Sequence, residues 1–322
     1  MDRRAFLAGC AGLTLAARAG EARAQSGPLT RIVFPFAAGG SGDMLCRLLA
    51  QHLPPLIDRS VIVENRTGGD GLIGIRAVKG AEPDSTTILV TTGPTMYLLP
   101  MVENQPSYDS TKDFLPVSQL ARFEFVVVVS PSIGVTDFKQ LVAWIKANPD
   151  KASYGVPSSG TIPHFTGWQL EKALGLSMTR VTYRGSAPII TDLIGGHVPI
   201  AVTTLSDTIT QHRAGAIRIV AVSGPTRSPF LPDVPNLKEA GVDLVGDGWY
   251  GMWLPAGSSP DFARKLSAAV AEILAKPDVK EKLNAVTLIP AGSTPEDLTK
   301  ALATDTAFWQ PIVKATGYKI TN

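Results

Sequence analysis

The sequence predicts an α/β fold of two lobes that face each other across a cleft. Two sets of strands and helices alternate along the chain, and glycine-rich turns follow several of the predicted strands. Further elements remain after the second set, and we expect them to return to the first lobe and complete it. With 322 residues, of which 44% are hydrophobic and 18% charged, the chain is long enough for two domains with a sizeable core.

The first strand and helix, within residues 31–53, are joined by a glycine turn that favours an anion. Residues 32–34 are apolar and partly β-branched, which predicts a short buried strand, and Pro35 ends it because proline has no N–H for a ladder. Residues 37–42 are too small for a packed element, and leucines at helical spacing follow Asp43. The free N–H groups and dipole of a helix N-terminus favour an anion, and glycine lets a ligand approach the backbone. A plain strand-to-helix turn is the other interpretation of this stretch.

The later elements divide the chain into three parts. We expect residues 25–124 to form lobe 1, residues 125–225 to form lobe 2, and residues 226–322 to return to lobe 1. The alternation of strands and helices predicts parallel sheets. Further strands are predicted at residues 60–64, 87–91, 125–130, 152–156, 179–183, 198–203, 217–222 and 248–254. Helices are predicted at residues 72–79, 165–174 and 260–275, and another is predicted to begin at about Ser186. Two more are predicted to begin after N-cap residues, one after Thr136 and one after Thr294, whose capping partner is Asp297.

Residues 1–24 have the pattern of a secretory signal that is cleaved near Ala24. Arg3 and Arg4 precede an apolar run, and a small-x-small cleavage pattern ends at Ala24. The paired arginines are typical of twin-arginine export. Cys10 lies in a stretch that mimics a lipoprotein box, so lipidation at Cys10 is an alternative.

The mature chain is close to neutral, which gives nucleic-acid binding no electrostatic support. The precursor has a formal net charge of +2, and the signal holds four arginines against two acidic residues, a surplus that accounts for all of it. No apolar run after the signal is long enough to span a bilayer. Cys46 is the one cysteine left after cleavage, so we expect a buried free thiol and no disulfide. Trp253 and Trp309 are expected in the core.

Motifs along the mature chain resemble the Bug (Bordetella uptake gene) family, the extracytoplasmic solute receptors of tripartite tricarboxylate transporters. They occur in family order and cover essentially the whole mature chain. They are RIVFPFAAGG at 31–40 with Asp43, VENR at 63–66, YD at 108–109 with KDF at 112–114, YRGSAP at 183–188, DLIGG at 192–196, LPDVP at 231–235 with EAG at 239–241, and residues 249–257.

The resemblance implies a type II periplasmic-binding-protein fold that closes on a small carboxylate, such as a dicarboxylate, an acidic amino acid or an aromatic acid. It implies a periplasmic monomer without cofactor or metal, which delivers its ligand to the membrane subunits of the transporter. Family members hold the carboxylate mainly with backbone amides and hydroxyls. The ligand-binding residues expected here are Phe36, Ala37, Ala38, Gly39, Gly40, Ser41, Asp43, Thr92, Gly93, Thr95, Ser158, Ser159, Gly160, Thr161, His164, Arg184, Gly185, Ser186, Ala187, Thr203 and Trp249.

Several of these residues have a plainer alternative role. Asp43 either orients a ligand or complements the helix dipole. His164 is either a site residue or a surface histidine, and Arg184 either pairs with a carboxylate or is a solvated residue at a strand end. Many relatives have Asp or Asn where Thr203 stands, so we do not expect the ligand to carry an amino group.

Three other functions compete with that of a transport receptor. A dinucleotide-binding enzyme is disfavoured because the glycine pattern that begins at Gly40 has Leu45 at its third glycine position. A serine hydrolase built on Ser158 lacks a G-x-S-x-G elbow and an assignable acid–histidine pair. A binding protein that docks to a sensor instead of a transporter is an alternative that the sequence leaves open. We therefore predict a binding protein and not an enzyme.

Overall fold

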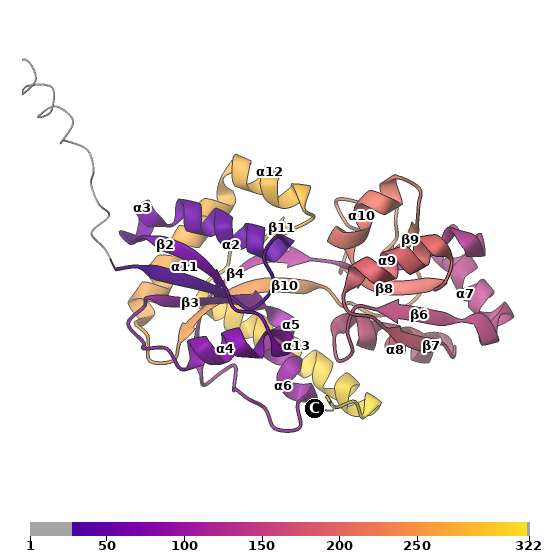
Figure 1. The fold of residues 1–322 in the computed structure, drawn as a ribbon, viewed down its shortest axis with the longest axis horizontal. Coiled ribbons are helices and arrows are strands. Elements are labelled where there is room, and N and C mark those ends of the chain that lie inside the picture. The colour runs from indigo at the N-terminus through magenta and orange to yellow at the C-terminus, as the bar shows by residue number, and fades with distance from the viewer. Residues whose placement is uncertain (1–27, 321–322) are drawn as a thin grey trace, which may run out of the picture.

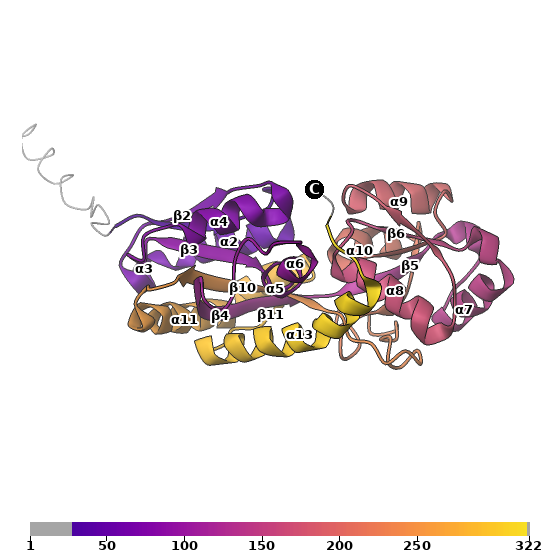
Figure 2. The same ribbon diagram turned by 90° about the horizontal axis from the view of Figure 1, so that it is seen from below.

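The computed structural model describes residues 28–320, which form two α/β lobes side by side (Figure 1, Figure 2). The expected signal, its cleavage near Ala24 and the alternative at Cys10 lie outside the described residues. Among the described helices, none is long and apolar enough to cross a bilayer. The two-lobed α/β fold is the one that the sequence predicts.

Within the described chain, lobe 1 is built on a six-stranded mixed sheet. Its strands, in sheet order, are β11 (Ile289–Pro290), β4 (Phe114–Phe123), β10 (Gly248–Pro255), β3 (Thr87–Thr92), β1 (Thr30–Phe34) and β2 (Val61–Asn65). β1 pairs in parallel with β2 and β3, whereas β10 is antiparallel to β3 and β4. The helices are α2 (Ser41–His52), α3 (Pro54–Ile57), α4 (Leu72–Lys79), α5 (Gly93–Tyr97), α6 (Leu99–Val102), α11 (Pro260–Ala275), α12 (Pro277–Ala285) and α13 (Pro295–Thr316), with a 3₁₀ turn η1 (Gly69–Gly71).

Lobe 2 has a five-stranded mixed sheet in the part of the chain that the structure describes. Its strands, in sheet order, are β7 (Thr179–Thr182), β6 (Ser153–Val156), β8 (Ile200–Thr204), β5 (Phe125–Val129) and β9 (Arg218–Val222). β6 is parallel to β7 and β8, and β5 is antiparallel to β8 and β9. The helices are α7 (Phe138–Ala147), α8 (Ile162–Leu174), α9 (Ser186–Gly195) and α10 (Leu205–Arg213), with 3₁₀ turns η2 (Pro131–Ile133) and η3 (Pro149–Lys151).

The chain crosses between the lobes twice. β4 passes into β5 through Glu124, and the chain returns into β10 just after Asp247 (Figure 1). Arg122 donates to one oxygen of Asp247 from Nε at 2.9 Å and from Nη2 at 2.6 Å, which ties the two crossings together. Because the chain runs out along β4 and back along β10, these two strands are antiparallel. The expected parallel pairing holds only for β1 with β2 and β3 and for β6 with β7 and β8.

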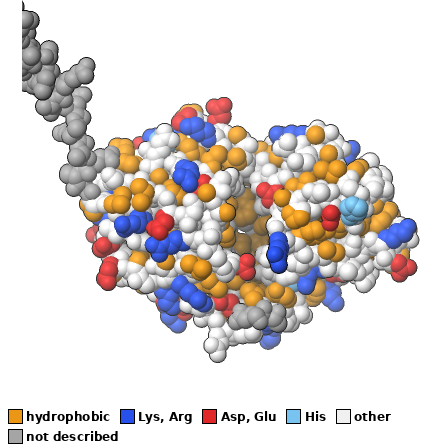
Figure 3. Space-filling model, in the orientation of Figure 1, with side chains coloured by type: hydrophobic (Ala, Val, Ile, Leu, Met, Phe, Trp, Pro, Cys, Tyr) orange, Lys and Arg blue, Asp and Glu red, His pale blue; other side chains and the backbone are white. Residues whose placement is uncertain are grey.

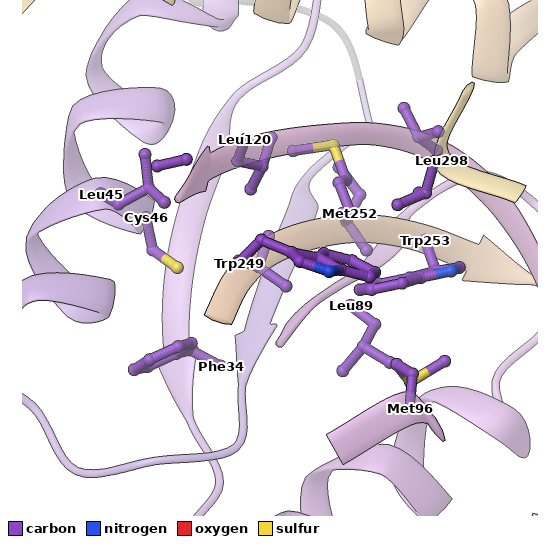
Figure 4. Close-up of a cluster of buried hydrophobic side chains, with 14 of the residues drawn as sticks. Phe34, Leu45, Cys46, Leu89, Met96, Leu120, Trp249, Met252, Trp253 and Leu298 are labelled. Atoms are coloured by element: carbon purple, nitrogen blue, oxygen red, sulfur yellow. The ribbon is translucent and has the colours of Figure 1, made fainter. Parts of the chain in front are cut away.

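Aromatic side chains fill the core of lobe 1 where β10 meets α5 and α13. Trp253 and Trp309 are buried, which confirms their expected place in the core. The rings of Trp249 and Trp253 lie 5.9 Å apart, side by side (Figure 4). Cys46 is buried and free, as expected for the one cysteine of the mature chain.

The caps of two helices can be compared with the sequence. The capping box of Thr294 and Asp297 at α13 is confirmed. The expected cap of α7 at Thr136 is wrong by one residue. Asp137 is the N-cap, because its Oδ1 accepts the amide of Gln140, three residues on, at 2.8 Å.

Asp305 on α13 provides a test of how the C-terminal helix is held on β10. Its Oδ2 accepts the indole N–H of Trp249 at 2.7 Å. Burial raises the pKa of Asp305 from 3.8 to about 6, although the bond from Trp249 opposes the rise. The folded state therefore holds the proton more tightly than the unfolded state, and stability falls as the pH rises from about 4 to about 6.

Asp305→Asn keeps an oxygen for Trp249 and removes this loss. We expect the free energy of unfolding to rise by up to about 3 kcal/mol at pH 7 and to change little at pH 4, measured by denaturant unfolding. Asp58→Asn, at an exposed position, is the control. A gain of equal size at both pH values would contradict the assignment.

Candidate functional site

The carboxyl-terminal ends of strands from both lobes border one cleft of about 470 Å³. Figure 3 shows this hollow between the lobes, with hydrophobic side chains in its depth. Lobe 1 contributes Phe34, Phe36, Ala37, Gly40, Ser41, Gly42, Asp70, Thr92, Pro94, Thr95, Leu98, Leu99, Phe123, Tyr250 and Ile320. Lobe 2 contributes Phe125, Pro157, Ser158, Ser159, Gly160, Thr161, Ile162, Pro163, Thr204, Ser206 and Asp207.

Three helices of the described chain begin at this cleft without a side-chain cap. α2 begins after Gly40, α8 after Thr161 and α10 after Thr204, and none of these three residues caps a backbone N–H with its side chain. The short helix α5 also begins at the cleft, but its N-cap Thr92 accepts the amide of Thr95 with its side chain. The cleft thus receives free backbone donors and the positive ends of three helix dipoles.

The turn before α2 is held from behind by Asp43. Its carboxylate accepts the amide of Gly39 at 3.0 Å, Nε of Arg47 at 2.8 Å and Nδ2 of Asn65 at 3.0 Å. Burial alone raises the pKa of Asp43, but the hydrogen bonds from Arg47, Gly39 and Asn65 outweigh burial and leave the pKa below its ordinary value. Gly39 has φ +92°, a conformation that favours glycine. Asp43 therefore shapes the turn and does not face the cleft.

The loop before α8 is held in a similar way by His164. The amide of Gly160 donates to Nδ1 of His164 at 2.9 Å, and the hydroxyl of Thr161 donates to the carbonyl of Ser158 at 2.9 Å. The ring of His164 is buried, and the guanidinium of Arg180 lies against its Nε2. Burial first, and the charge of Arg180 second, lower the pKa of His164 to about 4. A neutral, buried His164 supports the loop from below.

Two threonines at the end of β8 have different environments. Thr204 lines the cleft, and its hydroxyl donates to Asp207 at 2.6 Å. Thr203 is fully buried, and its hydroxyl is 2.9 Å from that of Ser186. Alternate residues of a strand point to opposite faces, so the polar position predicted at Thr203 is taken by its neighbour.

The turn after β3 contributes hydroxyls to the cleft. Thr92 and Thr95 line it, and their hydroxyls are 2.6 Å apart. Trp249 lies behind them in the core, where its ring comes within 2.3 Å of the position that a Cβ on Gly93 would take. Gly93 is therefore required by packing against Trp249, and neither residue lines the cleft.

The lining carries no cationic side chain among the described residues, although it includes the carboxylates Asp70 and Asp207. Tyr250 adds a phenol whose pKa is raised to about 12 by burial, against the effect of a hydrogen bond with Ser41. No group of three or more His, Cys, Asp or Glu residues in the described chain is placed to hold a metal ion. An anion in this cleft would therefore be held by amides and hydroxyls.

The structure brings some of the predicted site residues together and places the others outside the lining. Those in the lining are Phe36, Ala37, Gly40, Ser41, Thr92, Thr95, Ser158, Ser159, Gly160 and Thr161. Those outside it are Ala38, Gly39, Asp43, Gly93, His164, Arg184, Gly185, Ser186, Ala187, Thr203 and Trp249. The start of α9 is not part of the lining and lies beside the loop, where the amide of Gly185 donates to the carbonyl of Pro157 at 2.9 Å.

Several lining residues escaped the sequence reasoning. Thr204 is the last residue of β8, and Ser206 and Asp207 lie in the first turn of α10, so extending the predicted strand 198–203 by one residue would have indicated them. Phe123 and Tyr250 come from the crossing strands, and no local pattern connects them with the glycine turns.

A second hollow of about 580 Å³ lies on lobe 1, between the segment around Tyr108 and α13. Its lining includes Lys79, which pairs with Asp113 at 2.8 Å, and Lys112, which pairs with Asp109 at 3.1 Å, so both lysines of the lining are already engaged. All of its lining belongs to lobe 1, so a movement of the lobes cannot enclose a ligand in it. The cleft between the lobes is the better candidate.

Comparison with known proteins gives one consistent result. Residues 45–318 match the TctC family, described as the tripartite tricarboxylate transporter family receptor. A relative from Pseudomonas sp. strain P51, a UPF0065 protein in the tcbD-tcbE intergenic region, is 31% identical over 316 residues, which cover 94% of this chain and 92% of the relative.

Two solved structures have the same fold over nearly the whole described chain. R. palustris Rpa4515 with adipate is 30% identical with a TM-score of 0.81, over 90% of this chain and 97% of that one. The periplasmic binding protein BugD is 28% identical with a TM-score of 0.77, over 91% and 98% of the two chains.

His164→Asn tests the buried support of the α8 loop. The unfolded histidine titrates near 6.5 and the folded one near 4, so the wild type loses stability as the pH falls from about 6.5 to about 4. Asparagine does not titrate, and its amide oxygen can take the place of Nδ1 as acceptor for Gly160.

We expect the pH-dependent loss to shrink by up to about 3 kcal/mol near pH 4, measured by denaturant unfolding at pH 7.5 and pH 4. His197→Asn, at an exposed position, is the control. An unchanged dependence on pH in His164→Asn would show that His164 is not held neutral.

Proposed function

Because this chain belongs to the tripartite tricarboxylate transporter receptor family, it is a solute-binding receptor, and we propose that its interlobe cleft captures a small carboxylate. The sequence motifs indicated this same Bug-type receptor family, and the family match confirms that assignment. We further infer that the mature protein acts in the periplasm as a monomer after cleavage near Ala24, and that it passes the ligand to the membrane subunits of a transporter.

The observation that carries the proposal is the convergence of three uncapped helix N-termini on one cleft. Each terminus contributes on the order of 0.3–2 kcal/mol toward an anion, so several together are needed for useful affinity. α2 belongs to lobe 1, whereas α8 and α10 belong to lobe 2. A carboxylate bound by both lobes therefore favours the closed arrangement by its differential affinity for that state.

Neutral donors complete the proposed carboxylate site. Backbone amides at Gly40 to Gly42 and at Ser158, Ser159 and Thr161 would bind the oxygens, with help from the hydroxyls of Thr92 and Thr95. This mode of binding agrees with a lining that has no cation among the described residues. The relative Rpa4515 has a structure with adipate, which supports a carboxylate as the class of ligand.

The rest of the lining indicates an apolar body for the ligand. Aromatic rings of both lobes and of the crossings stand around the cleft, including Phe36, Phe123, Phe125 and Tyr250. A volume of about 470 Å³ suits a small molecule. We therefore expect the part of the ligand beyond the bound carboxylate to be mainly hydrocarbon, aliphatic or aromatic.

The first test is a thermal-shift screen of the mature protein with carboxylates and their methyl esters. Adipate, malate, glutamate, benzoate and citrate represent the main classes. A ligand that binds only the folded state raises the melting temperature, by about 5 °C at a hundred times its Kd. We expect one class of acid to give such a shift and its ester to give none.

The screen is repeated after refolding from denaturant, which frees a retained ligand. An ester that shifts the melting temperature as much as its acid would contradict carboxylate recognition. If no acid shifts the melting temperature after refolding, the proposal as a whole is contradicted.

Gly40→Leu tests the site itself. Gly40 has φ −82°, and a Cβ there meets no atom within 4 Å, so leucine fits the backbone and projects into the cleft at the start of α2. We expect a loss of affinity of at least about a hundredfold with little change in folding stability, measured by calorimetric titration. Gly80→Leu is the matched control, because Gly80 is exposed outside the cleft and a Cβ there would lie 3.5 Å from the carbonyl oxygen of Arg76, an ordinary contact. Wild-type affinity in Gly40→Leu would contradict the site.

A further inference from the structure

The C-terminal segment, residues 317–320, lies between the two lobes. α13 runs along lobe 1 and ends at Thr316, and its C-cap Gly317 turns the chain with a φ of +64° (Figure 2). Beyond this turn the chain reaches the space between α6 of lobe 1 and α8 of lobe 2 (Figure 2). No sequence motif singled out this segment, yet Ile320 lines the cleft.

The segment is fastened to lobe 1 by hydrogen bonds to the end of α6. The amide of Ile320 donates to the carbonyl of Val102 at 2.8 Å. The ammonium of Lys319 donates to the carbonyls of Met101 at 2.8 Å and Glu103 at 3.1 Å. A lysine at the last carbonyls of a helix also satisfies their unpaired acceptors. Lobe 1 thus fixes the backbone of the segment.

The side chain of Tyr318 reaches in the other direction, to lobe 2. Its ring stands edge-on to His164 at 4.9 Å between centroids, and to Phe165 at 6.2 Å. Its Cε1 lies only 2.9 Å from the place that a Cβ on Gly160 would occupy. Gly160 also has φ +73°, so both its backbone and the neighbouring ring require glycine. Tyr318 therefore rests directly on the loop that leads into α8.

That loop is part of the proposed carboxylate site. Ser158, Ser159, Gly160 and Thr161 line the cleft, and the amide of Gly160 is held by His164, against which Tyr318 packs. A side chain anchored in lobe 1 thus supports, from behind, the loop by which lobe 2 meets a ligand.

We propose that Tyr318 is a positioning residue of the ligand site, which holds loop 158–161 of lobe 2 in its binding geometry from an anchor on lobe 1. The expected effect on ligand affinity rests on the proposed function. The support of the loop by Tyr318 does not, because it is a property of the free protein. Ile320, on the same anchored segment, forms part of the cleft wall. A ligand that must order the loop itself binds more weakly, because it carries the entropic cost of that ordering.

The test compares Tyr318→Ala with Tyr318→Phe in the full mature protein. Phenylalanine keeps the ring that packs on Gly160 and His164, whereas alanine removes it. Phe308→Ala, which removes an exposed ring from α13, is the matched control for the loss of an aromatic side chain. Tyr318→Leu, which retains an apolar side chain, gives the same comparison where the alanine variant does not fold, as judged by circular dichroism.

Two readouts are measured. The first is hydrogen exchange of the amides of residues 158–165 without ligand, and the second is the Kd for the acid that gives the largest shift in the screen. We expect Tyr318→Ala to speed exchange in this segment and to raise the Kd at least about tenfold. Tyr318→Phe and Phe308→Ala should match the wild type in both.

Wild-type exchange in Tyr318→Ala would overturn the proposal, and so would a wild-type Kd in that variant. The exchange measurement needs no ligand, so it decides the role of Tyr318 even where no acid binds the wild-type protein. Failure of the wild type to bind any acid would instead count against the carboxylate function.

Discussion

The double crossing of the chain between the lobes is the constraint on which the rest of the structure depends. Arg122 and Asp247 join the outgoing and returning segments, and Glu124 stands buried between β4 and β5. The carbonyl of Glu124 accepts the amide of Leu205 at 2.9 Å, so the crossing also positions the start of α10. Because both crossings lie at one side, the strand ends of the two lobes border the same space, and the helices that follow these strands direct their N-termini into it.

In the proposed site, affinity for an anion would come from the backbone instead of from charged side chains. Two charged residues outside the lining support it from behind: Asp43 fixes the turn before α2, and Arg180 lies beside the neutral ring of His164 below the loop before α8. Free amides and dipoles are fixed by the fold, so they need little reorganisation when a ligand arrives. A cleft of this kind suits reversible capture, since a ligand held too tightly could not be passed on.

The sequence predicted the local features of the site well, but it predicted poorly which residues distant in sequence come together around the cleft. The strand at β1, the glycine turn and the start of α2 followed from composition and spacing, because neighbouring residues determine them. β4 was missed, since Pro116 and its polar residues hide a strand that crosses between lobes. The inward position at β8 was assigned to Thr203 instead of Thr204, because the face of a strand depends on its exact end. The roles of His164 and Trp249 depend on burial by residues distant in sequence, which no local pattern reports.

The most direct measurement of the central claim is a crystal structure of the mature protein with the carboxylate selected by the screen. We expect the carboxylate oxygens to accept hydrogen bonds from backbone amides at the start of α2 in lobe 1 and from the α8 loop in lobe 2, with no lysine or arginine side chain on the ligand. A carboxylate paired with a cationic side chain, or bound outside the cleft between the lobes, would contradict this claim.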